Sequence, residues 1–353
     1  MTPTIAGETN DLKNAWAKLR EENSHLRIRE AAEMLNGSEG ELLATQTGET
    51  VVRLEPKFAE ILQDLHKLGR IMALTRNNEI VHERKGEYKN VEVMSGHGKM
   101  GLAVNEDIDL RIFFANWHFA FAVESDSPRG TLHSFQFFDI DGTAIHKVFL
   151  QSDDYLSAFN DLVAKYKAKD QSQTINVQPK PAKKAETPDS EIDIEGFQAA
   201  WSNLKDTHDF FPLLGKFKVG REQALRLADK EMARLVDAKS FRFVLEEAGK
   251  RKLPIMVFVG NAGIIQIHTG EVEKVLDARG WFNVMDENFN LHIDQGKIAR
   301  AYVVKKPTVD GIVTSLELFN EQGENVALFF GKRKPGIPEK EEWRELISDL
   351  LEF

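Results

Sequence analysis

The sequence contains no cysteine among its 353 residues. This absence excludes disulfide bonds, thiolate-ligated haem, iron–sulfur clusters and cysteine-based zinc sites. The N-terminal stretch MTPTIAGETNDLKNAW has no basic segment followed by an apolar run, so it does not resemble a secretory signal. No apolar stretch approaches the roughly 20 residues that a membrane-spanning helix needs. We therefore expect a cytoplasmic protein that does not insert into a membrane.

The chain also lacks an excess of positive charge. It has 46 Lys and Arg residues against 56 Asp and Glu residues, which gives a formal net charge of −10. An acidic balance argues against general affinity for nucleic acid or for anionic membranes. We therefore expect no nucleic-acid partner, although this charge is compatible with a local basic pocket for an anionic ligand.

A polar segment divides the chain into two parts, each long enough for a domain with its own core. The segment, KAKDQSQTINVQPKPAKKAETPDSEID, is rich in Lys, Pro, Gln, Ser and Asp and has few large apolar side chains. Such a composition cannot bury enough surface to offset the entropy lost on ordering. We predict a first domain over residues 1–166, a flexible linker over 167–195 and a second domain over 196–353.

The two predicted domains resemble each other in sequence. NAWAKLREEN aligns with AAWSNLKDTH at a shift of 185 residues, which pairs Trp16 with Trp201. IMALTRNNEIVHERKGE aligns with IMVFVGNAGIIQIHTGE at a shift of 184, which pairs Asn77 with Asn261. SFQFFDIDGTAI aligns with SLELFNEQGENV at a shift of 181. Several blocks in one order at nearly one spacing indicate an internal duplication; the alternative is two runs of similar strand–turn patterns.

Each copy is predicted to begin with helices and to continue as strands. Residues 11–66 and 196–250 carry apolar residues three and four positions apart among Leu, Ala, Glu and Lys. The stretches that follow are rich in β-branched and aromatic residues, are separated by turns such as IDG and EQG, and precede a final helical pattern. The predicted class is α+β, with two tandem structural repeats that each form a large antiparallel sheet with flanking helices.

One histidine lies in an aromatic pattern that is typical of a helix. In FQAAWSNLKDTHDFFPLL, apolar residues and His208 recur at helical spacing, namely Phe197, Trp201, Leu204, His208 and Phe211. A neutral imidazole in an apolar pocket suits axial ligation of haem iron, because haem is a flat hydrophobic disc. On this pattern alone, a buried histidine that is bonded to a backbone carbonyl is the more common interpretation. Asn23 occupies the corresponding place in the first copy.

An arginine and a basic set are further candidates for a site. Arg111 lies in the alternating stretch EDIDLRIFFANW, where an arginine among aromatic residues can pair with an acid, stack on a ring or face a ligand. An ordinary surface arginine fits that stretch as well. The second half carries a basic set that could pair with an anionic ligand, although solvated loop charges are the simpler interpretation for most of its members: Arg221, Lys305, Lys306, Lys332, Arg333 and Lys334.

Taken together, these stretches resemble a known family, the haemin-degrading and haem-trafficking proteins of Gram-negative haem uptake (HemS/HmuS/ChuS/PhuS type). The resemblance covers nearly the whole chain. In the second half it is carried by the run from Trp201 to Phe211 and by the motifs REQA, IMVFVGN and KPTxDGxVTSLELF. In the first half it is carried by TRN, DLRIF, HSxQFFD and HKV.

The resemblance implies one haem in a cleft that both halves border. It makes His208 the proximal iron ligand and places Arg111 on the distal side, as the catalytic residue if the protein is an enzyme. It further implies that six residues contact the haem: Phe113, Phe211, Arg221, Lys306, Phe330 and Arg333. Some members carry tyrosine in the stretch written here as ALFFGKR, so Phe330 removes a polar contact.

Two functions agree with this resemblance. In the first, haem is both cofactor and substrate, and it is opened oxidatively with release of iron. In the second, the protein is a haem carrier that passes its cargo to a separate haem oxygenase. The resemblance also implies an inner-membrane haem importer as a partner. A third reading is a haem-free scaffold protein whose aromatic residues form plain core. The sequence does not separate the enzyme from the carrier, because both need His208 and a pocket.

Overall fold

The computed structural model describes residues 5–23, 26–94, 100–128, 130–183, 185–334 and 336–352. The chain divides into two compact units. The first consists of Met1–Arg76, Arg84–Pro181 and Asn261–Ile265, and the second of Asn77–Glu83, Ala182–Gly260 and Gln266–Phe353. Each unit therefore includes a short segment from the opposite half of the sequence. No helix in the described ranges is long and apolar enough to cross a membrane.

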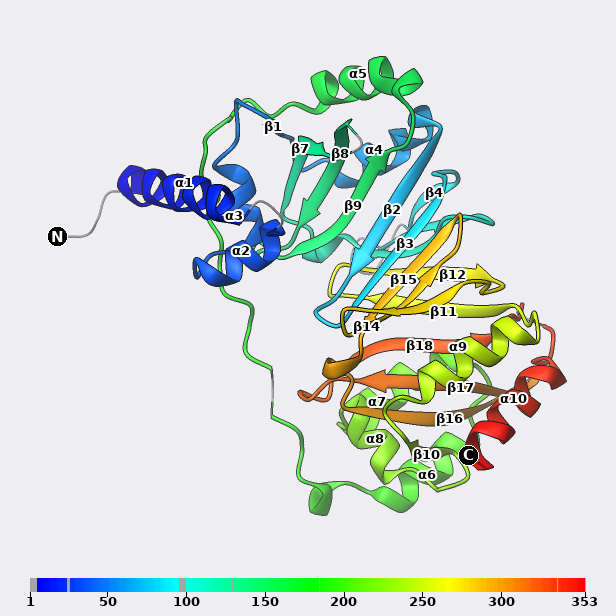
Figure 1. Ribbon diagram of the computed structural model, residues 1–353. Helices are drawn as coiled ribbons and strands as arrows, with labels where there is room; N and C mark the ends of the chain where they lie inside the picture. The colour runs from blue at the N-terminus through cyan, green and yellow to red at the C-terminus, as the bar shows by residue number, and fades with distance from the viewer. Residues whose placement is uncertain are drawn as a thin grey trace. The chain divides into compact units, whose positions relative to one another are not determined.

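The first unit begins with helices and continues into antiparallel strands (Figure 1). Its helices are α1 (Ile5–Glu22), α2 (Ile28–Met34), α3 (Glu39–Ala44), α4 (Phe58–Asp64) and α5 (Leu156–Tyr166). Its strands are β1 (Val51–Arg53), β2 (Arg70–Arg76), β4 (Val91–Met94), β5 (Met100–Val104), β6 (Asp109–Phe113), β7 (Phe119–Ser127), β8 (Gly130–Phe138) and β9 (Ala144–Leu150). Strand β3 (Ile80–Glu87) carries residues of both units.

The strands β1, β7, β8, β9 and β2 pair in that order, and β4, β5 and β6 pair with one another. Alternation along β7 directs its residues to two faces. On one face Ala120 and Ala122 join the core that includes Phe159 of α5. On the other face Phe121 and Val123 join a smaller core with α3. The sheet is therefore covered on both faces.

The second unit repeats this plan. Its helices are α6 (Ile194–Ser202), α7 (Phe210–Phe217), α8 (Arg221–Leu227), α9 (Ser240–Lys250) and α10 (Glu341–Glu352). Its strands are β10 (Ala233–Val236), β11 (Ile255–Gly260), β13 (Val275–Ala278), β14 (Trp281–Met285), β15 (Phe289–Asp294), β16 (Arg300–Thr308), β17 (Gly311–Phe319) and β18 (Asn325–Gly331). Strand β12 (Ile264–Gly270) carries residues of both units.

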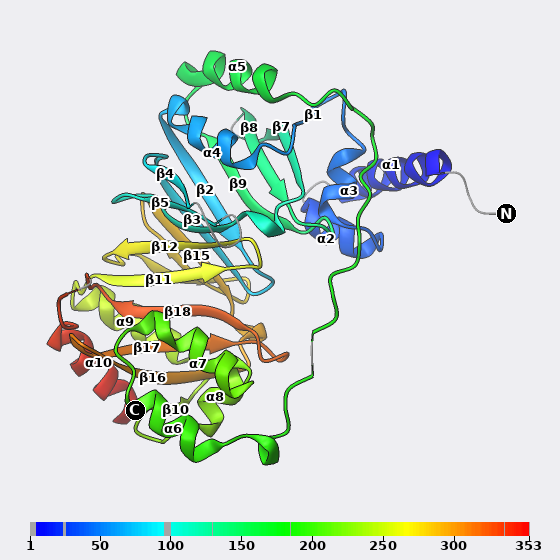
Figure 2. The same cartoon turned by 180° about the vertical axis from the view of Figure 1, so that it is seen from behind.

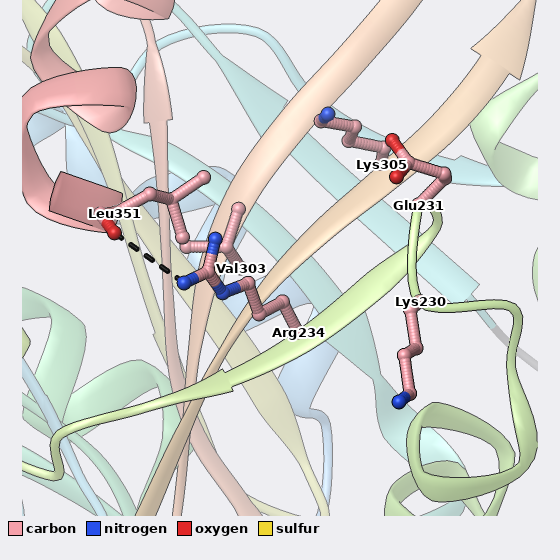
Figure 3. A pocket seen from close by; sticks show the side chains of 6 residues that line it. All are labelled: Lys230, Glu231, Arg234, Val303, Lys305 and Leu351. Atoms are coloured by element: carbon pink, nitrogen blue, oxygen red, sulfur yellow. Dashed lines mark hydrogen bonds between the residues drawn. The ribbon is translucent and has the colours of Figure 1, made fainter.

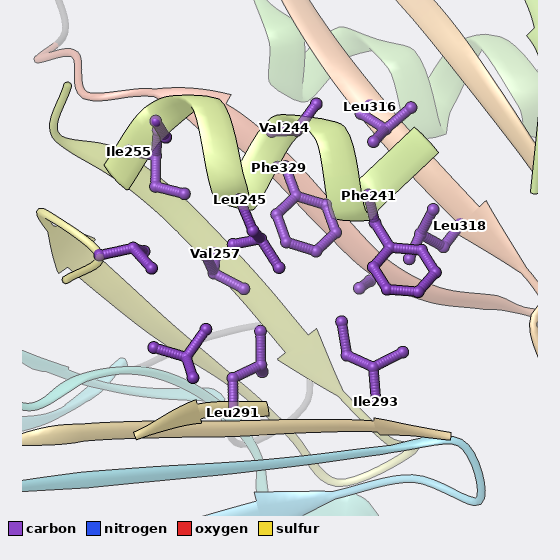
Figure 4. Close-up of a cluster of buried hydrophobic side chains, with 14 of the residues drawn as sticks. Phe241, Val244, Leu245, Ile255, Val257, Leu291, Ile293, Leu316, Leu318 and Phe329 are labelled. Atoms are coloured by element: carbon purple, nitrogen blue, oxygen red, sulfur yellow. The ribbon is translucent and has the colours of Figure 1, made fainter. Parts of the chain in front are cut away.

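Two groups of helices cover the two faces of the second unit's sheet (Figures 1 and 2). Helices α9 and α10 pack on one face, where Phe241 and Trp343 are fully buried among strand residues. Figure 4 shows Leu245 of α9 directed toward Val257 of β11 and Leu291 of β15. Helices α6, α7 and α8 pack on the opposite face, against Tyr302 and Val304 of β16. This second face carries the candidate site.

The predicted duplication is confirmed. In the second unit β10, β16, β17, β18 and β11 pair in that order, which matches β1, β7, β8, β9 and β2 of the first unit. Strands β13, β14 and β15 likewise match β4, β5 and β6. The α+β class with two tandem repeats was therefore predicted correctly. The helical stretches predicted over 11–66 and 196–250 also contain the short strands β1 and β10, which the sequence pattern missed.

The segment exchanged into the first unit is fixed by Asn261. Its Nδ2 donates hydrogen bonds to the backbone oxygens of Arg76 at 2.9 Å and Ile145 at 2.8 Å. Two residues on, the backbone oxygen of Gly263 accepts bonds from the backbone N–H of Phe113 and the indole of Trp117, both at 2.9 Å. A Cβ on residue 263 would lie 2.7 Å from side-chain carbons of Ile145, so only glycine fits.

The segment exchanged into the second unit makes the same contacts. Asn77 Nδ2 donates to the backbone oxygens of Gly260 at 3.2 Å and Val326 at 2.8 Å. The backbone oxygen of Glu79 accepts from the N–H of Asp294 at 2.9 Å. The sequence alignment pairs Asn77 with Asn261, and these bonds are counterparts of those in the first unit. The exchange is therefore a property that both repeats share.

The segment 167–195 contacts described residues at both of its ends. Gln171 donates to the backbone oxygens of Arg53 and Ala168 at 2.8 Å, and Ile175 is buried in the first unit. Near the other end, Asp189 accepts bonds from Gln223 and Arg226. The flexible linker predicted over 167–195 and the domain limits at 166 and 196 stay predictions.

Candidate functional site

The prediction of one continuous helix over 197–214 is wrong. Helix α6 ends at Ser202, a 3-10 turn covers Thr207–Asp209, and α7 begins at Phe210. The Asp206 carboxylate accepts the backbone N–H of His208 at 2.8 Å, so Asp206 acts as an N-cap and starts a new turn. Pro212 has no N–H, which fits the first turn of α7 but breaks the interior of a longer helix. Asp206 and Pro212 are the sequence signals that the helical spacing concealed.

The break divides the predicted aromatic stripe into buried and exposed members. Phe197, Trp201 and Leu204 remain buried, and Phe210 packs edge-on against Trp201 with ring centroids 4.7 Å apart. Phe211, by contrast, is 65% exposed. The side chain of His208 is 91% exposed. His208 is therefore not the buried structural histidine that the helical pattern also allowed.

The exposed imidazole of His208 is held by one carboxylate. Its Nδ1 lies 2.7 Å from Oδ1 of Asp206. Hydrogen bonds from the backbone N–H and the side chain of His208 lower the pKa of Asp206, so this carboxylate is ionised and acts as an acceptor. Nδ1 then carries the proton, and the lone pair of the neutral ring lies on Nε2. A carboxylate that fixes the tautomer in this way orients a histidine as a metal ligand.

The neighbouring aromatic pair contacts an arginine. Arg221, the first residue of α8, has its guanidinium carbon 5.7 Å from the ring of Phe210 and 5.4 Å from the ring of Phe211. These distances are typical of cation–π contacts. Phe210 contributes its ring to the core, and Phe211 presents its ring to solvent. Arg221 thus places a positive charge next to the exposed apolar ring of Phe211.

Beneath these rings lies a buried cluster of three charged side chains. Glu317 of β17 accepts bonds from Arg221 Nε at 2.9 Å and from Lys306 Nζ at 2.7 Å. Burial would raise the pKa of Glu317, but the charges of Arg221 and Lys306 outweigh it and lower the pKa to about 2. Burial lowers the pKa of Lys306, whose Nζ also lies 4.6 Å from the centroid of the Phe210 ring.

The last two predicted residues of the second unit lie on and just after β18. Phe330 stands opposite Ser315 in the register of β17 and β18, on the face that carries Glu317, and its ring contacts Phe258 at 5.2 Å. The Nε of Arg333 is buried and has no hydrogen-bond partner within the described part of the chain. A buried donor without a partner is costly, and an anionic ligand would satisfy it.

The remaining predicted residues, Arg111 and Phe113, lie in the first unit on β6. The expected alternation is confirmed, since Leu110 and Ile112 are buried while Arg111 and Phe113 are partly exposed. Arg111 Nη1 donates to the carboxylate of Asp109 and to the backbone oxygen of Leu110. The distal role of Arg111 and the contact role of Phe113 remain predictions.

Other histidines of the second unit are less suited to hold a metal. His268 is 3% exposed and stacks on Phe289 with ring centroids 3.6 Å apart. Nδ1 of His292 lies 2.7 Å from Oδ1 of Asn283. Among the residues that the structure describes, no group of three or more His, Asp or Glu side chains could hold a metal ion. A haem needs fewer protein ligands, because the macrocycle supplies four nitrogens.

A cavity of about 130 Å³ lies on another part of the second unit (Figure 3). Its lining includes Lys230, Arg234 and Lys305, and Arg234 donates to the backbone oxygen of Leu351 at 3.4 Å. None of the predicted haem contacts lines it. The cavity is too small for a ligand of haem size, which needs several hundred Å³.

Sequence reasoning missed two residues of the site, Asp206 and Glu317. Asp206 carried a usable signal, because Asp is a preferred N-cap residue and the Pro that follows at 212 disfavours a helix that continues through it from further upstream. Glu317 carried a weaker one: it alternates with Leu316 and Leu318 in a strand that is covered on both faces. A charged residue in such a strand is expected to have partners of opposite charge.

These features define the class of protein: a duplicated α+β chain with an exposed, carboxylate-oriented histidine beside a buried cationic cluster. The chain belongs to the family described as the haemin-degrading HemS.ChuX domain, which it matches twice, over residues 36–166 and 218–350. It is 35% identical over 344 residues to the hemin transport protein HmuS of Yersinia pestis, which covers 96% of this chain and 97% of that protein.

Two solved structures resemble the whole chain. The heme-binding protein PhuS of Pseudomonas aeruginosa, in its holo form, has 46% sequence identity and a TM-score of 0.94, with 97% of this chain and 99% of that chain covered. The heme-degrading enzyme ChuS of Escherichia coli O157:H7 has 34% identity and a TM-score of 0.88, with the same coverage.

Proposed function

We propose that this protein binds one haem in bacterial haem-iron acquisition and that Nε2 of His208 is the axial ligand of the iron. The observation that carries the proposal is the geometry of His208, whose ring is exposed while Nδ1 is bonded to Asp206. A neutral imidazole oriented by a carboxylate is a strong donor to haem iron. The relatives named above, a heme-binding protein and a hemin transport protein, support haem as the ligand.

The surroundings of His208 fit the other parts of a haem. The exposed ring of Phe211 offers an apolar surface to the macrocycle. Arg221 and Arg333 offer guanidinium donors to the anionic propionates, since the Nη atoms of Arg221 and the Nε of Arg333 have no hydrogen-bond partner within the described ranges. Phe330 lies on the same face of the sheet as this cluster. Phe113 is proposed as a further contact through the family resemblance.

We further propose that the bound haem is degraded oxidatively, with dioxygen as the oxidant and an external electron donor, so that iron is released. The support is the family itself and the heme-degrading relative ChuS. Arg111 is proposed as the distal residue, where its permanently charged guanidinium would donate hydrogen bonds to groups near the iron. Asp109 holds the guanidinium in place from the same strand.

The second candidate function is a carrier that passes haem to a separate haem oxygenase. One observation favours it: HmuS, to which the chain is 35% identical over nearly its whole length, is named a hemin transport protein. In both cases we propose a cytoplasmic location and an inner-membrane haem importer as the source of haem. The absence of cysteine is compatible with that compartment.

A turnover experiment separates the two functions. The protein is loaded with one equivalent of haemin and then given a reductant under air, with catalase present to remove free peroxide that would bleach haem chemically. An enzyme loses its Soret band while a bilin-like product and chelatable iron appear. A carrier instead keeps a stable ferrous spectrum, and that result would refute the enzyme proposal. A protein without any haemin-induced Soret shift would refute haem binding itself.

A further inference from the structure

The charged cluster under Phe210 has an unequal charge count. Two cations, Arg221 and Lys306, share the single carboxylate of Glu317, whose Oε1 also accepts the hydroxyl of Ser315 at 3.2 Å. No part of the Glu317 side chain is exposed. The cluster therefore holds one uncompensated positive charge in a place where water screens it only in part, since the Arg221 side chain is 16% exposed. An anion that reached this charge would bring the cluster to neutrality.

The two cations differ in their freedom to meet such an anion. Lys306 is 4% exposed, is bonded to Glu317 and is covered by the ring of Phe210. Arg221 uses its Nε for Glu317, and its Nη atoms make no hydrogen bond with the described residues. Its guanidinium also borders Phe211, which is exposed. The open donors of the cluster thus belong to Arg221.

We propose that Glu317 is a positioning residue that holds Arg221 and cancels one of the two cations, so that the cluster accepts a single carboxylate of the ligand. Lys306 then serves as the internal counter-ion of Glu317 and does not touch the ligand, which departs from the contact role that the resemblance gave it. The inference rests on the proposed haem site and adds that this cluster binds one of the two propionates.

Variants that change the charge count in steps test this reasoning. Lys306→Met leaves Arg221 and Glu317, which cancel, so the attraction for a carboxylate falls. Lys306→Met with Glu317→Gln restores one positive charge, and the glutamine oxygen still accepts from Arg221. Lys306→Met with Glu317→Ala restores the same charge but removes the acceptor that positions Arg221. The last two variants therefore separate charge from positioning.

The measured quantity is the affinity for haemin divided by the affinity for haemin dimethyl ester, in which both propionates are uncharged. We expect a ratio of about tenfold or more for the wild type, because a charge-assisted hydrogen bond of this strength is lost in the ester. Lys306→Met lowers the ratio about threefold or more. The double variant with Glu317→Gln (the Gln double variant) returns the ratio to within about twofold of the wild-type value. The double variant with Glu317→Ala does not restore the ratio. Lys305→Met is the matched control, since Lys305 points to the opposite face of β16 and its loss leaves the ratio unchanged.

Several results would overturn the inference. A ratio near one in the wild type means that the protein binds haem without recognising a propionate carboxylate. A low ratio in Lys306→Met that the Gln double variant fails to restore means that Lys306 contacts the ligand directly. An unchanged ratio in Lys306→Met removes the counter-ion role. If the wild type binds neither haemin nor its ester, the proposed function fails and this inference falls with it. Melting temperatures and far-UV circular dichroism confirm that each variant is folded before its ratio is used.

Discussion

Asn261→Asp is predicted to destabilise the first unit although residue 261 belongs to the second repeat in sequence. The change is isosteric and keeps the oxygen that accepts the N–H of Gly263 at 2.9 Å. It replaces the amide donor, which bonds the backbone oxygens of Arg76 and Ile145. A carboxylate at this position would face two carbonyl oxygens without a proton to share.

The expected magnitude follows from these bonds. Each lost hydrogen bond contributes about 1 kcal/mol net, and the two carbonyls left without a partner add a desolvation cost of similar size. We therefore expect a loss of about 3 kcal/mol in the free energy of unfolding of the first unit. Asn203→Asp is the control, because Asn203 follows the end of α6, is exposed, and its amide makes one bond, to the backbone oxygen of Ala199 in that helix. That control is expected to cost under about 1 kcal/mol.

Urea unfolding gives the free energy, and amide hydrogen exchange locates the loss. Exchange should accelerate in β2 and β9, whose carbonyls Asn261 bonds, before it accelerates in β11 and β18 of the second unit. Acceleration first in β11 and β18 would refute the exchange of segments between repeats. A loss of unfolding free energy as small as that of Asn203→Asp would refute the predicted value of about 3 kcal/mol.

Three further predictions concern acid stability, the distal residue and the linker. Burial lowers the pKa of His146 from 6.5 to about 3, so its contribution to stability is present above pH 6.5 and is lost as the pH falls toward 3. His146→Gln should flatten that decline by roughly a few kcal/mol in acid unfolding curves, and an equally steep decline would contradict it. Arg111→Ala should retain haemin affinity within about tenfold while changing the spectrum of the reduced complex, and a larger loss would make Arg111 an anchor. Trypsin should cut first after Lys183, between the two held ends of the connecting segment, and a first cut inside either unit would argue against a linker there.

The repeat architecture could be predicted because the duplication left matched blocks at nearly constant shifts. Asn77 and Asn261 were paired in that alignment, and the structure shows that both make the same kind of bonds. The sequence could not predict which unit holds the carbonyl groups that accept these bonds. A hairpin turn that enters its own unit and one that enters the other have the same local sequence requirements, so only the tertiary structure distinguishes them.

The local structure of the candidate site was predicted only in part. His208 remains a proposed ligand, and the apolar helix face expected around it does not exist, because local capping by Asp206 and the missing N–H of Pro212 override the helical spacing of the aromatic residues. The pairing of Lys306 with Glu317 was also beyond reach. It depends on the register of β16 and β17, which places Lys306 opposite Val313, four residues from Glu317 on the same face, and the sequence does not give that register.

The most direct test of the account is the axial-ligand signature of ferric haem in His208→Ala. Haemin is titrated into the wild type, His208→Ala and the control His66→Ala, an exposed histidine of the first unit, and each complex is measured by absorbance and electron paramagnetic resonance. We predict that His208→Ala alone loses the histidine-ligated spectrum and most of its affinity while its circular dichroism is unchanged. A wild-type ligand signature in His208→Ala would show that another residue, such as His268 or His292, holds the iron, and the site proposed on Asp206 and His208 would be wrong.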